Sequence, residues 1–142
     1  MKKTALITGA TSGIGEACAR RFAKGGYDVI ITGRRVQHLA TLKKELESED
    51  VRVLAVAFNV RNRKAATAAI NSLPRDWQQI DVLVNNAGLA LGLEPEYEGS
   101  FDDWETMIDT NVKGLLTMTR LVVPGMVKRN SGHIINIGSV AG

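Results

Sequence analysis

The sequence has 142 residues, of which 44% are hydrophobic and 23% are charged, a composition typical of one globular domain or part of one. Eighteen Lys and Arg residues against fifteen Asp and Glu give a formal charge of only +3, and they are dispersed, which argues against a nucleic-acid partner. The single cysteine, Cys18, cannot form an internal disulfide, and the N-terminus shows no signal peptide or membrane span. We therefore expect a soluble, cytoplasmic protein with no membrane partner.

Short apolar runs alternate with segments of helical length along the whole chain. The expected strands are residues 4–8, 28–32, 51–58, 80–85 and 133–138, and the expected helices are residues 13–25, 35–48, 62–73 and 101–129. Most of the strand runs are almost continuously apolar, which is typical of strands covered on both faces. The alternation predicts right-handed βαβ units. We expect an α/β fold, a doubly wound parallel sheet, in one domain over residues 1–142.

The first expected helix shows an apolar stripe. Ile14, Cys18 and Phe22 recur every four residues, so we expect them to face the core.

The last expected helix contains a polar residue among apolar ones. Asn111 lies three residues after Ile108 and four before Leu115, so the spacing places it on their face. A buried amide without partners costs about 1–3 kcal/mol, so we expect Asn111 to bind something specific. A structural bond within the helix is the alternative. Pro124-Gly125 should kink or interrupt the same helix.

Unusual residues follow the ends of the expected strands, where open parallel sheets bind ligands. After the first strand comes "TGATSGIG", with Gly9, Gly13 and Gly15 leading directly into a helix. Small residues let the backbone approach a pyrophosphate, and a helix N-terminus offers free N–H groups to it. The spacing is G-x-x-x-G-x-G rather than G-x-G-x-x-G, and three glycines alone are equally compatible with a turn that binds nothing.

The second strand ends in Gly33, Arg34 and Arg35. An NAD-binding protein usually offers a carboxylate to the ribose hydroxyls at this point. Two guanidinium groups instead suit a 2′-phosphate. The alternative is a solvated helix start, but cations at that point oppose the helix dipole, which favours a functional role for the two arginines. The charges therefore favour NADP over NAD as the cofactor.

The other polar groups are less specific. "NNAG" places Asn85 and Asn86 at a strand end, where they can tie neighbouring loops together or accept a ligand. His38 and His133 have no metal-ligand spacing, so no metal site is expected. No Ser-His-Asp or Cys-His arrangement is present.

Together, "TGATSGIG", "NNAG", Asn111 and Ser139 resemble the short-chain dehydrogenase/reductase family over nearly the whole chain. "NNAGLALGLEP", "DDWETMIDTNVKGLL" and "PGMVKRNSGHIINIGSVAG" are most similar to its NADP-dependent 3-hydroxy acid dehydrogenases, which act on serine and allo-threonine and reduce malonic semialdehyde. The resemblance implies a Rossmann-like dinucleotide-binding domain with strand order 3-2-1-4-5. It also implies a small-molecule substrate and a homotetramer.

The resemblance assigns roles to individual residues. The expected cofactor residues are Gly9, Ser12, Gly13, Ile14 and Gly15 at the pyrophosphate, Arg34 and Arg35 at the 2′-phosphate, Asn59 and Val60 at the adenine, and Asn86, Ala87 and Gly88 along the ribose and the path to the nicotinamide. Ser139 would hydrogen-bond the substrate oxygen, and Asn111 would hold a water in a proton relay.

The sequence departs from the family pattern twice. Asn59 stands where the family usually has Asp, so we expect a weaker contact with the adenine amino group. The family's Tyr-x-x-x-Lys, whose tyrosine is the general acid/base, does not occur in the 142 residues. We therefore expect a C-terminally truncated, incomplete domain. The open alternatives are an inactive NADP-binding fragment and, remotely, an RNA-binding Rossmann-like domain.

Overall fold

The computed structural model describes residues 2–86 and 100–137. The strands are β1 (Thr4–Ile7), β2 (Asp28–Gly33), β3 (Val53–Ala57), β4 (Val82–Asn85) and β5 (His133–Asn136). The helices are α1 (Gly13–Lys24), α2 (Val36–Leu46), α3 (Arg63–Asn71), α4 (Phe101–Ile108) and α5 (Gly114–Arg129), with short helical turns η1 (Glu47–Glu49) and η2 (Arg75–Trp77) and a π-helical segment η4 (Asp109–Lys113). The expected strands and helices are thus present, and the last expected helix is divided into three parts.

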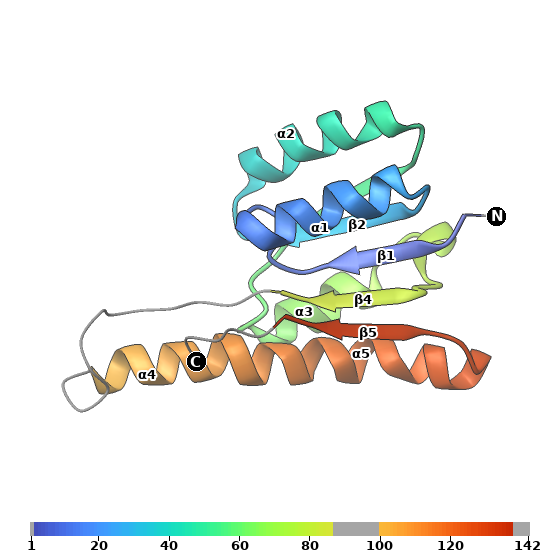
Figure 1. Cartoon of the computed structure of the whole chain (residues 1–142). Coiled ribbons are helices and arrows are strands. Elements are labelled where there is room, and N and C mark those ends of the chain that lie inside the picture. Colours follow the sequence, from blue (N-terminus) through green and yellow to red (C-terminus); the bar gives the residue numbers. More distant parts are fainter. Residues whose placement is uncertain (1, 87–99, 138–142) are drawn as a thin grey trace.

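The five strands form one parallel sheet in the order β3-β2-β1-β4-β5. This confirms the order 3-2-1-4-5. Every neighbouring pair is parallel, and the arrowheads of β1, β4 and β5 in Figure 1 point the same way, so the carboxyl ends of the strands share one edge. The chain direction across the sheet reverses between β1 and β4, and ligands of such sheets bind beside this switch.

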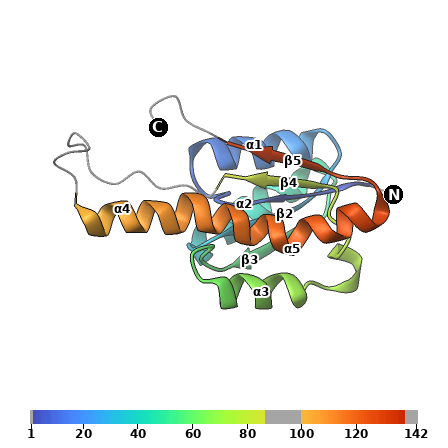
Figure 2. The same ribbon diagram turned by 90° about the horizontal axis from the view of Figure 1, so that it is seen from below.

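Helices cover both faces of the sheet (Figures 1 and 2). Successive strand residues point to opposite faces, so each strand contributes to two cores. Ala5, Ile7 and Val29 pack with residues of α1 and α2. Leu6 and Ile30 pack on the other face with residues of α3 and α5. The continuous apolar runs in the sequence reflect this burial on both sides.

Helix α1 faces the sheet with small residues rather than with the expected stripe. Gly15, Ala19 and Ala23 are its buried positions. Cys18 and Phe22 are only partly buried, at the margin of the core. Ile14 is 58% exposed, so the prediction that it faces the core was wrong. Small side chains let the helix approach the sheet closely, and larger neighbours then lie at the edge of the contact.

The buried face of the last helical region also differs from the prediction. The buried positions are Thr110, Gly114, Met118, Val122 and Met126, spaced four residues apart. The π-helical segment alters the helical phase, so the face that begins in α4 is not the one that α5 buries.

Asn111, in the middle of that segment, is exposed. The argument from a buried amide therefore does not apply to it, and the prediction that it shares a core face was wrong. Helix α5 also continues through Pro124 without interruption. The departure from α-helical geometry lies instead at Asp109–Lys113.

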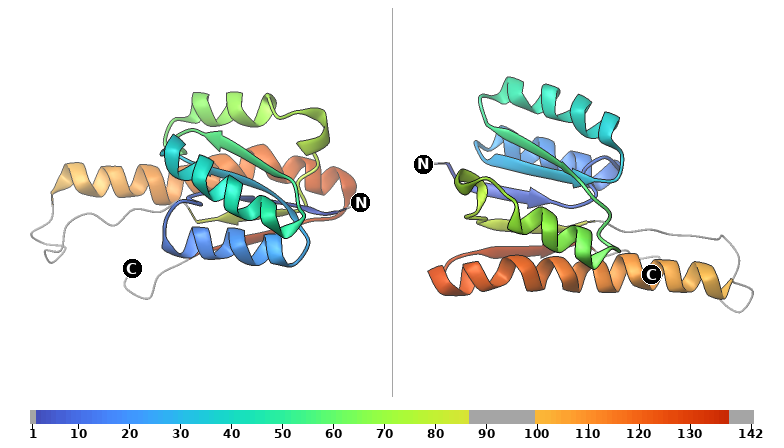
Figure 3. Two further views of the ribbon diagram at one scale, coloured as in Figure 1. Left: turned by 90° about the horizontal axis from the view of Figure 1, so that it is seen from above. Right: turned by 180° about the vertical axis from the view of Figure 1, so that it is seen from behind.

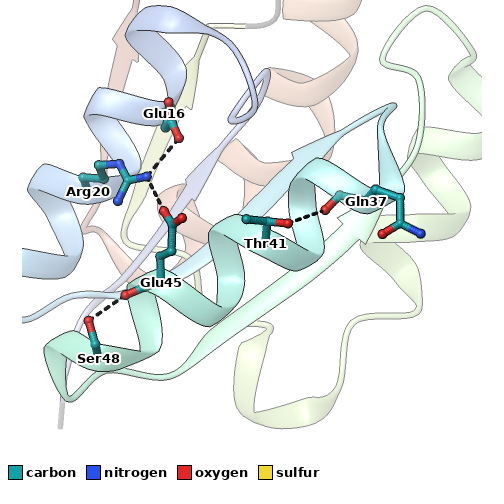
Figure 4. A network of polar contacts seen from close by, with 6 residues as sticks. All are labelled: Glu16, Arg20, Gln37, Thr41, Glu45 and Ser48. Carbon is teal, nitrogen blue, oxygen red and sulfur yellow. Dashed lines mark hydrogen bonds and ion pairs between the residues drawn. The ribbon is translucent and has the colours of Figure 1, made fainter.

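Helices α1 and α2 lie side by side over one face (Figure 3) and are joined by surface ion pairs. Arg20 contacts Glu16 of its own helix at 3.0 Å and also Glu45 of α2 (Figure 4). Hydrogen bonds from Glu45 and then Glu16 raise the pKa of Arg20 above its usual value. The side chains are about half exposed, and such pairs contribute only about 0–1 kcal/mol, so the apolar contacts dominate the docking of α2.

Candidate functional site

The loop between β1 and α1 is closed by hydrogen bonds to one carbonyl group. Gly9 has a φ of 60°, a conformation that favours glycine. Its carbonyl oxygen accepts hydrogen bonds from Ser12 Oγ at 3.2 Å and from Asn86 Nδ2 at 3.1 Å. A Cβ added at Gly15 would lie 1.9 Å from the Gly9 oxygen and 2.4 Å from Asn86 Nδ2. The loop therefore keeps this shape only because Gly15 has no side chain.

Helix α1 begins directly after this loop. Ser12 is its N-cap residue, but its hydroxyl donates to Gly9 and accepts no hydrogen bond from the first helical turn. The first turn, which includes Gly13 and Ile14, therefore has no side-chain cap. Uncapped N–H groups together with the positive end of the helix dipole attract an anion.

Two asparagines at the end of β4 connect neighbouring elements. The backbone N–H of Asn86 donates to Thr8 Oγ1 at 2.9 Å. Asn85 Nδ2 donates to Thr119 Oγ1 at 3.2 Å and to Asn136 Oδ1 at 3.0 Å. Both residues thus tie neighbouring elements together, one of the two readings of "NNAG". Asn85 is 5% exposed, and its Nδ2 is occupied within the fold, whereas its Oδ1 is buried without a hydrogen-bond partner among the described residues.

The arginines after β2 lie beside the same loop. Arg34 and Arg35 are both exposed, and Arg35 is the N-cap residue of α2. Arg35 Nη2 lies 3.1 Å from the carbonyl oxygen of Thr11 and 3.3 Å from its Oγ1. In residues 2–86 and 100–137, no carboxylate forms an ion pair with either arginine. Both positive charges therefore remain available to an anionic ligand.

Asn59 follows β3 and forms a turn with its own backbone. Its Oδ1 accepts a hydrogen bond from the backbone N–H of Arg61 at 3.0 Å, and its carbonyl accepts one from Asn62 N at 2.9 Å. One lone pair of the amide oxygen is thus already used. A second lone pair remains, which can still accept a hydrogen bond.

A pocket of about 340 Å³ joins these loops at the carboxyl edge of the sheet. Six of the expected cofactor residues line it: Gly9, Ser12, Arg34, Arg35, Asn59 and Val60. Sequence reasoning assigned no cofactor role to the other lining residues, which are Thr11, Thr32, Gly33, Phe58, Arg61 and Thr110. Four other expected residues do not line the pocket: Gly13, Ile14 and Gly15 at the start of α1, and Asn86 directly after β4.

All the charged residues that line this pocket are basic. Arg34, Arg35 and Arg61 line it, and none of its lining residues is acidic. Val60, which is buried, supplies an apolar surface. Arg61 gave no signal in the sequence beyond its position directly after "NV", because only the fold shows that the β3–α3 loop faces the β2–α2 loop. The pocket suits a ligand with an anionic group and a flat apolar part.

Asn111 lies next to the pocket but does not line it. Its neighbour Thr110 does, and Thr110 Oγ1 is buried without a hydrogen-bond partner among the described residues. The π-helical segment that contains both residues is a rare conformation, often associated with functional sites.

Three expected site residues, Ala87, Gly88 and Ser139, lie outside the described residues. In the described part of the chain, no group of three His, Cys, Asp or Glu side chains could hold a metal ion. None of the helices described is long and apolar enough to span a bilayer.

Comparison with known proteins agrees with this arrangement. The sequence pattern of the short chain dehydrogenase family matches residues 3–142. The chain therefore belongs to the short-chain dehydrogenase family.

Individual relatives are similar over nearly the whole chain. The NADP-dependent 3-hydroxy acid dehydrogenase YdfG of Salmonella typhi is 61% identical over 137 residues, which are 96% of this chain and 54% of that protein. Sulfoacetaldehyde reductase 2 of Chromohalobacter salexigens is 48% identical over 143 residues, covering 100% of this chain and 56% of the relative. The chain thus spans about half the length of these relatives.

A solved structure is also similar to this chain in sequence and fold. The closed form of serine dehydrogenase complexed with NADP+ is 57% identical, with a TM-score of 0.91 over 98% of this chain and 55% of that one.

Proposed function

We propose that this chain carries the adenosine-side binding site of an NADP-dependent oxidoreductase. The observation that carries the proposal is the pocket lined by Arg34, Arg35 and Arg61 with no acidic residue. A 2′-phosphate distinguishes NADP from NAD, and guanidinium groups recognise phosphate through paired hydrogen bonds. The NADP+ complex of the similar serine dehydrogenase supports the same cofactor.

We divide the proposed cofactor site into four parts. The uncapped start of α1 and its loop would hold the pyrophosphate, using Gly9, Ser12, Gly13, Ile14 and Gly15. Arg34 and Arg35 would bind the 2′-phosphate, and Asn59 with Val60 would border the adenine. Asn86, Ala87 and Gly88 would continue the site towards the nicotinamide. Gly15 and Asn86 contribute through the loop that they hold in shape.

Bound NADP(H) would supply hydride transfer to or from the substrate carbon that bears the oxygen. Ser139 would donate a hydrogen bond to that oxygen. Asn111 would hold a water that passes the proton onward. The π-helical segment supports the role of Asn111, because such a segment displaces backbone carbonyl groups from their regular α-helical partners.

A small 3-hydroxy acid, or a related alcohol or carbonyl compound, is the substrate class we propose. The names of the relatives support it: one is a 3-hydroxy acid dehydrogenase, and the solved neighbour is a serine dehydrogenase. The relative that is 48% identical is named for another carbonyl substrate, sulfoacetaldehyde, so identity at this level does not fix the substrate.

A second candidate function is NADP binding without turnover by the 142 residues alone. The absence of Tyr-x-x-x-Lys from the sequence favours it. An assay of NADP+ reduction with serine, using Ser139→Ala as the control, separates the two candidates.

We also propose that the protein forms a homo-oligomer, a tetramer by family, through α4 and α5. Ile108, Val112 and Leu116 are each at least half exposed and follow one another every four residues. Phe101, at the start of α4, is 77% exposed. Figure 2 shows α4 projecting beyond the sheet in line with α5, where a second copy could cover this apolar face. The cytoplasmic location stays a prediction.

Charge reversal of one arginine tests the cofactor assignment. Arg34→Asp should weaken NADP+ binding roughly ten- to hundredfold, because a hydrogen bond to a charged group contributes about 1.5–3 kcal/mol. NAD+ binding should be kept or improve, since a carboxylate can accept from the ribose hydroxyls. Both dissociation constants are measured by calorimetry.

Arg75→Asp is the matched control. Arg75 lies in η2, before β4 and thus at the opposite edge of the sheet, and its replacement changes the net charge equally. If Arg34→Asp and Arg75→Asp weaken NADP+ binding equally, or if NAD+ binding falls together with NADP+ binding, the assignment is wrong.

A further inference from the structure

We propose that Thr11 is a positioning residue that sets the preference for a 2′-phosphate by holding the guanidinium group of Arg35. The inference rests on the proposed function, because it takes Arg35 to face that phosphate. Thr11 lies in the loop between β1 and α1, and Arg35 ends the loop between β2 and α2. The residue thus connects the pyrophosphate loop to the loop that would select the cofactor.

Three contacts join the two loops at this point. Arg35 Nη2 donates to the Thr11 carbonyl oxygen at 3.1 Å and lies 3.3 Å from Thr11 Oγ1. The Thr11 side chain also packs on Gly33, where a Cβ would lie 3.4 Å from Oγ1 and 3.6 Å from Cγ2. The neighbouring backbone N–H of Ala10 donates to the Thr32 carbonyl at 3.0 Å. Thr11 is therefore fixed in place before it contacts Arg35.

The adjacent arginine provides an internal contrast. Arg34 and Arg35 are both exposed and both line the pocket. Of these two arginines, only Arg35 has a side chain held by hydrogen bonds to residues 2–86 and 100–137; the side chain of Arg34 has none there. A free arginine side chain loses rotamer entropy when a ligand fixes it, and a side chain that is already held loses less.

The contact leaves most of the guanidinium group available. Only Nη2 of Arg35 contacts Thr11, so Nε and Nη1 can still donate to phosphate oxygens. Thr11 would therefore favour only those ligands that carry a 2′-phosphate, and it would act through Arg35 rather than by touching the ligand.

Two ligands isolate this effect: ADP, and 2′-phospho-ADP, which is ADP with an additional phosphate on the 2′-oxygen. Thr11→Val removes the hydroxyl and keeps the side-chain shape. Calorimetry should show that this variant binds 2′-phospho-ADP about three- to tenfold more weakly, because the backbone contact remains, while its affinity for ADP is unchanged. Thr11→Ser, which keeps the hydroxyl, should bind both ligands like the unaltered chain.

Two double variants then separate positioning from direct contact. In the Arg35→Ala background, Thr11→Val should have no further effect on 2′-phospho-ADP, because the group that it positions is gone. In the Arg34→Ala background, it should keep its full effect.

Three results would overturn the inference: no effect of Thr11→Val, equal losses for the two ligands, or a loss that persists without Arg35. A different result, in which the unaltered chain binds 2′-phospho-ADP no more tightly than ADP, would contradict the proposed cofactor itself and the inference with it.

Discussion

At Gly15, helix α1 comes so close to the β1–α1 loop that a methyl group cannot be accommodated. The nearest atoms to an added Cβ are the carbonyl oxygen of Gly9, at 1.9 Å, and Asn86 Nδ2, at 2.4 Å. The first belongs to the backbone and cannot rotate away. The same carbonyl accepts hydrogen bonds from Ser12 and Asn86, so displacing it would disturb both of these hydrogen bonds.

Gly15→Ala should therefore destabilise the fold by about 1–3 kcal/mol, the usual cost of overpacking, and weaken the binding of NADP+. Thermal unfolding and calorimetry measure the two effects. Gly125→Ala is the matched control in another helix, because its Cβ would meet only a side-chain atom, Arg129 Nη1, at 3.1 Å, and no backbone atom. The control should be neutral or stabilise by up to about 1 kcal/mol through helix propensity. An unfolding temperature for Gly15→Ala equal to that of the control would show that the loop tolerates a side chain.

Single residues of the pocket were predictable from the sequence where they directly follow a strand. Arg34 and Arg35 were found because the carboxyl ends of parallel strands meet at one edge, whereas Asn59 was assigned from the family resemblance. Thr11 and Arg61 follow strands at the same edge but were assigned no role, because the residues that line one pocket depend on how two loops distant in sequence face each other. Periodicity and spacing describe one segment at a time and carry no such information.

Helix faces were less predictable than helix positions. Around Asn111, apolar residues occur on almost every side of the chain segment, so several faces fit a core equally well. The π-helical segment then changes the phase between α4 and α5, and the sequence offered no sign of it. At Gly114 a Cβ would lie 2.9 Å from Val60 Cγ2. The close contact of α5 with the β3–α3 loop therefore decides which face is buried.

The exposed apolar face of α4 and α5, formed by Ile108, Val112 and Leu116, leads to a prediction about assembly. If a second copy covers it, Leu116→Lys should reduce the molecular mass measured by light scattering during gel filtration, because a charge would be buried in the interface. Val36→Lys is the matched control: Val36 is an apolar residue of α2 that is 64% exposed and lies outside this face. An unaltered chain that is monomeric, or a Leu116→Lys variant of unaltered mass, would show that no second copy covers this face.

At the scale of the whole molecule, the parallel sheet was predictable from the alternation of strands and helices, and its strand order from the family resemblance. Five strands in the order β3-β2-β1-β4-β5 bring the glycine loop, the arginines and the Asn59 turn to one edge. The described residues supply the adenosine side of a dinucleotide site. Ser139 and the path to the nicotinamide fall outside them. Because Tyr-x-x-x-Lys does not occur in the 142 residues, cofactor binding is a sharper test of the molecule than turnover.

The central claim is that this edge of the sheet binds NADP in preference to NAD, and parallel calorimetric titrations of the unaltered chain with NADP+ and NAD+ test it most directly. We expect NADP+ to bind at least about tenfold more tightly, since one well-formed contact to the 2′-phosphate contributes about 1.4 kcal/mol or more. Equal affinities, tighter binding of NAD+, or no binding of either cofactor to a folded chain would contradict the account.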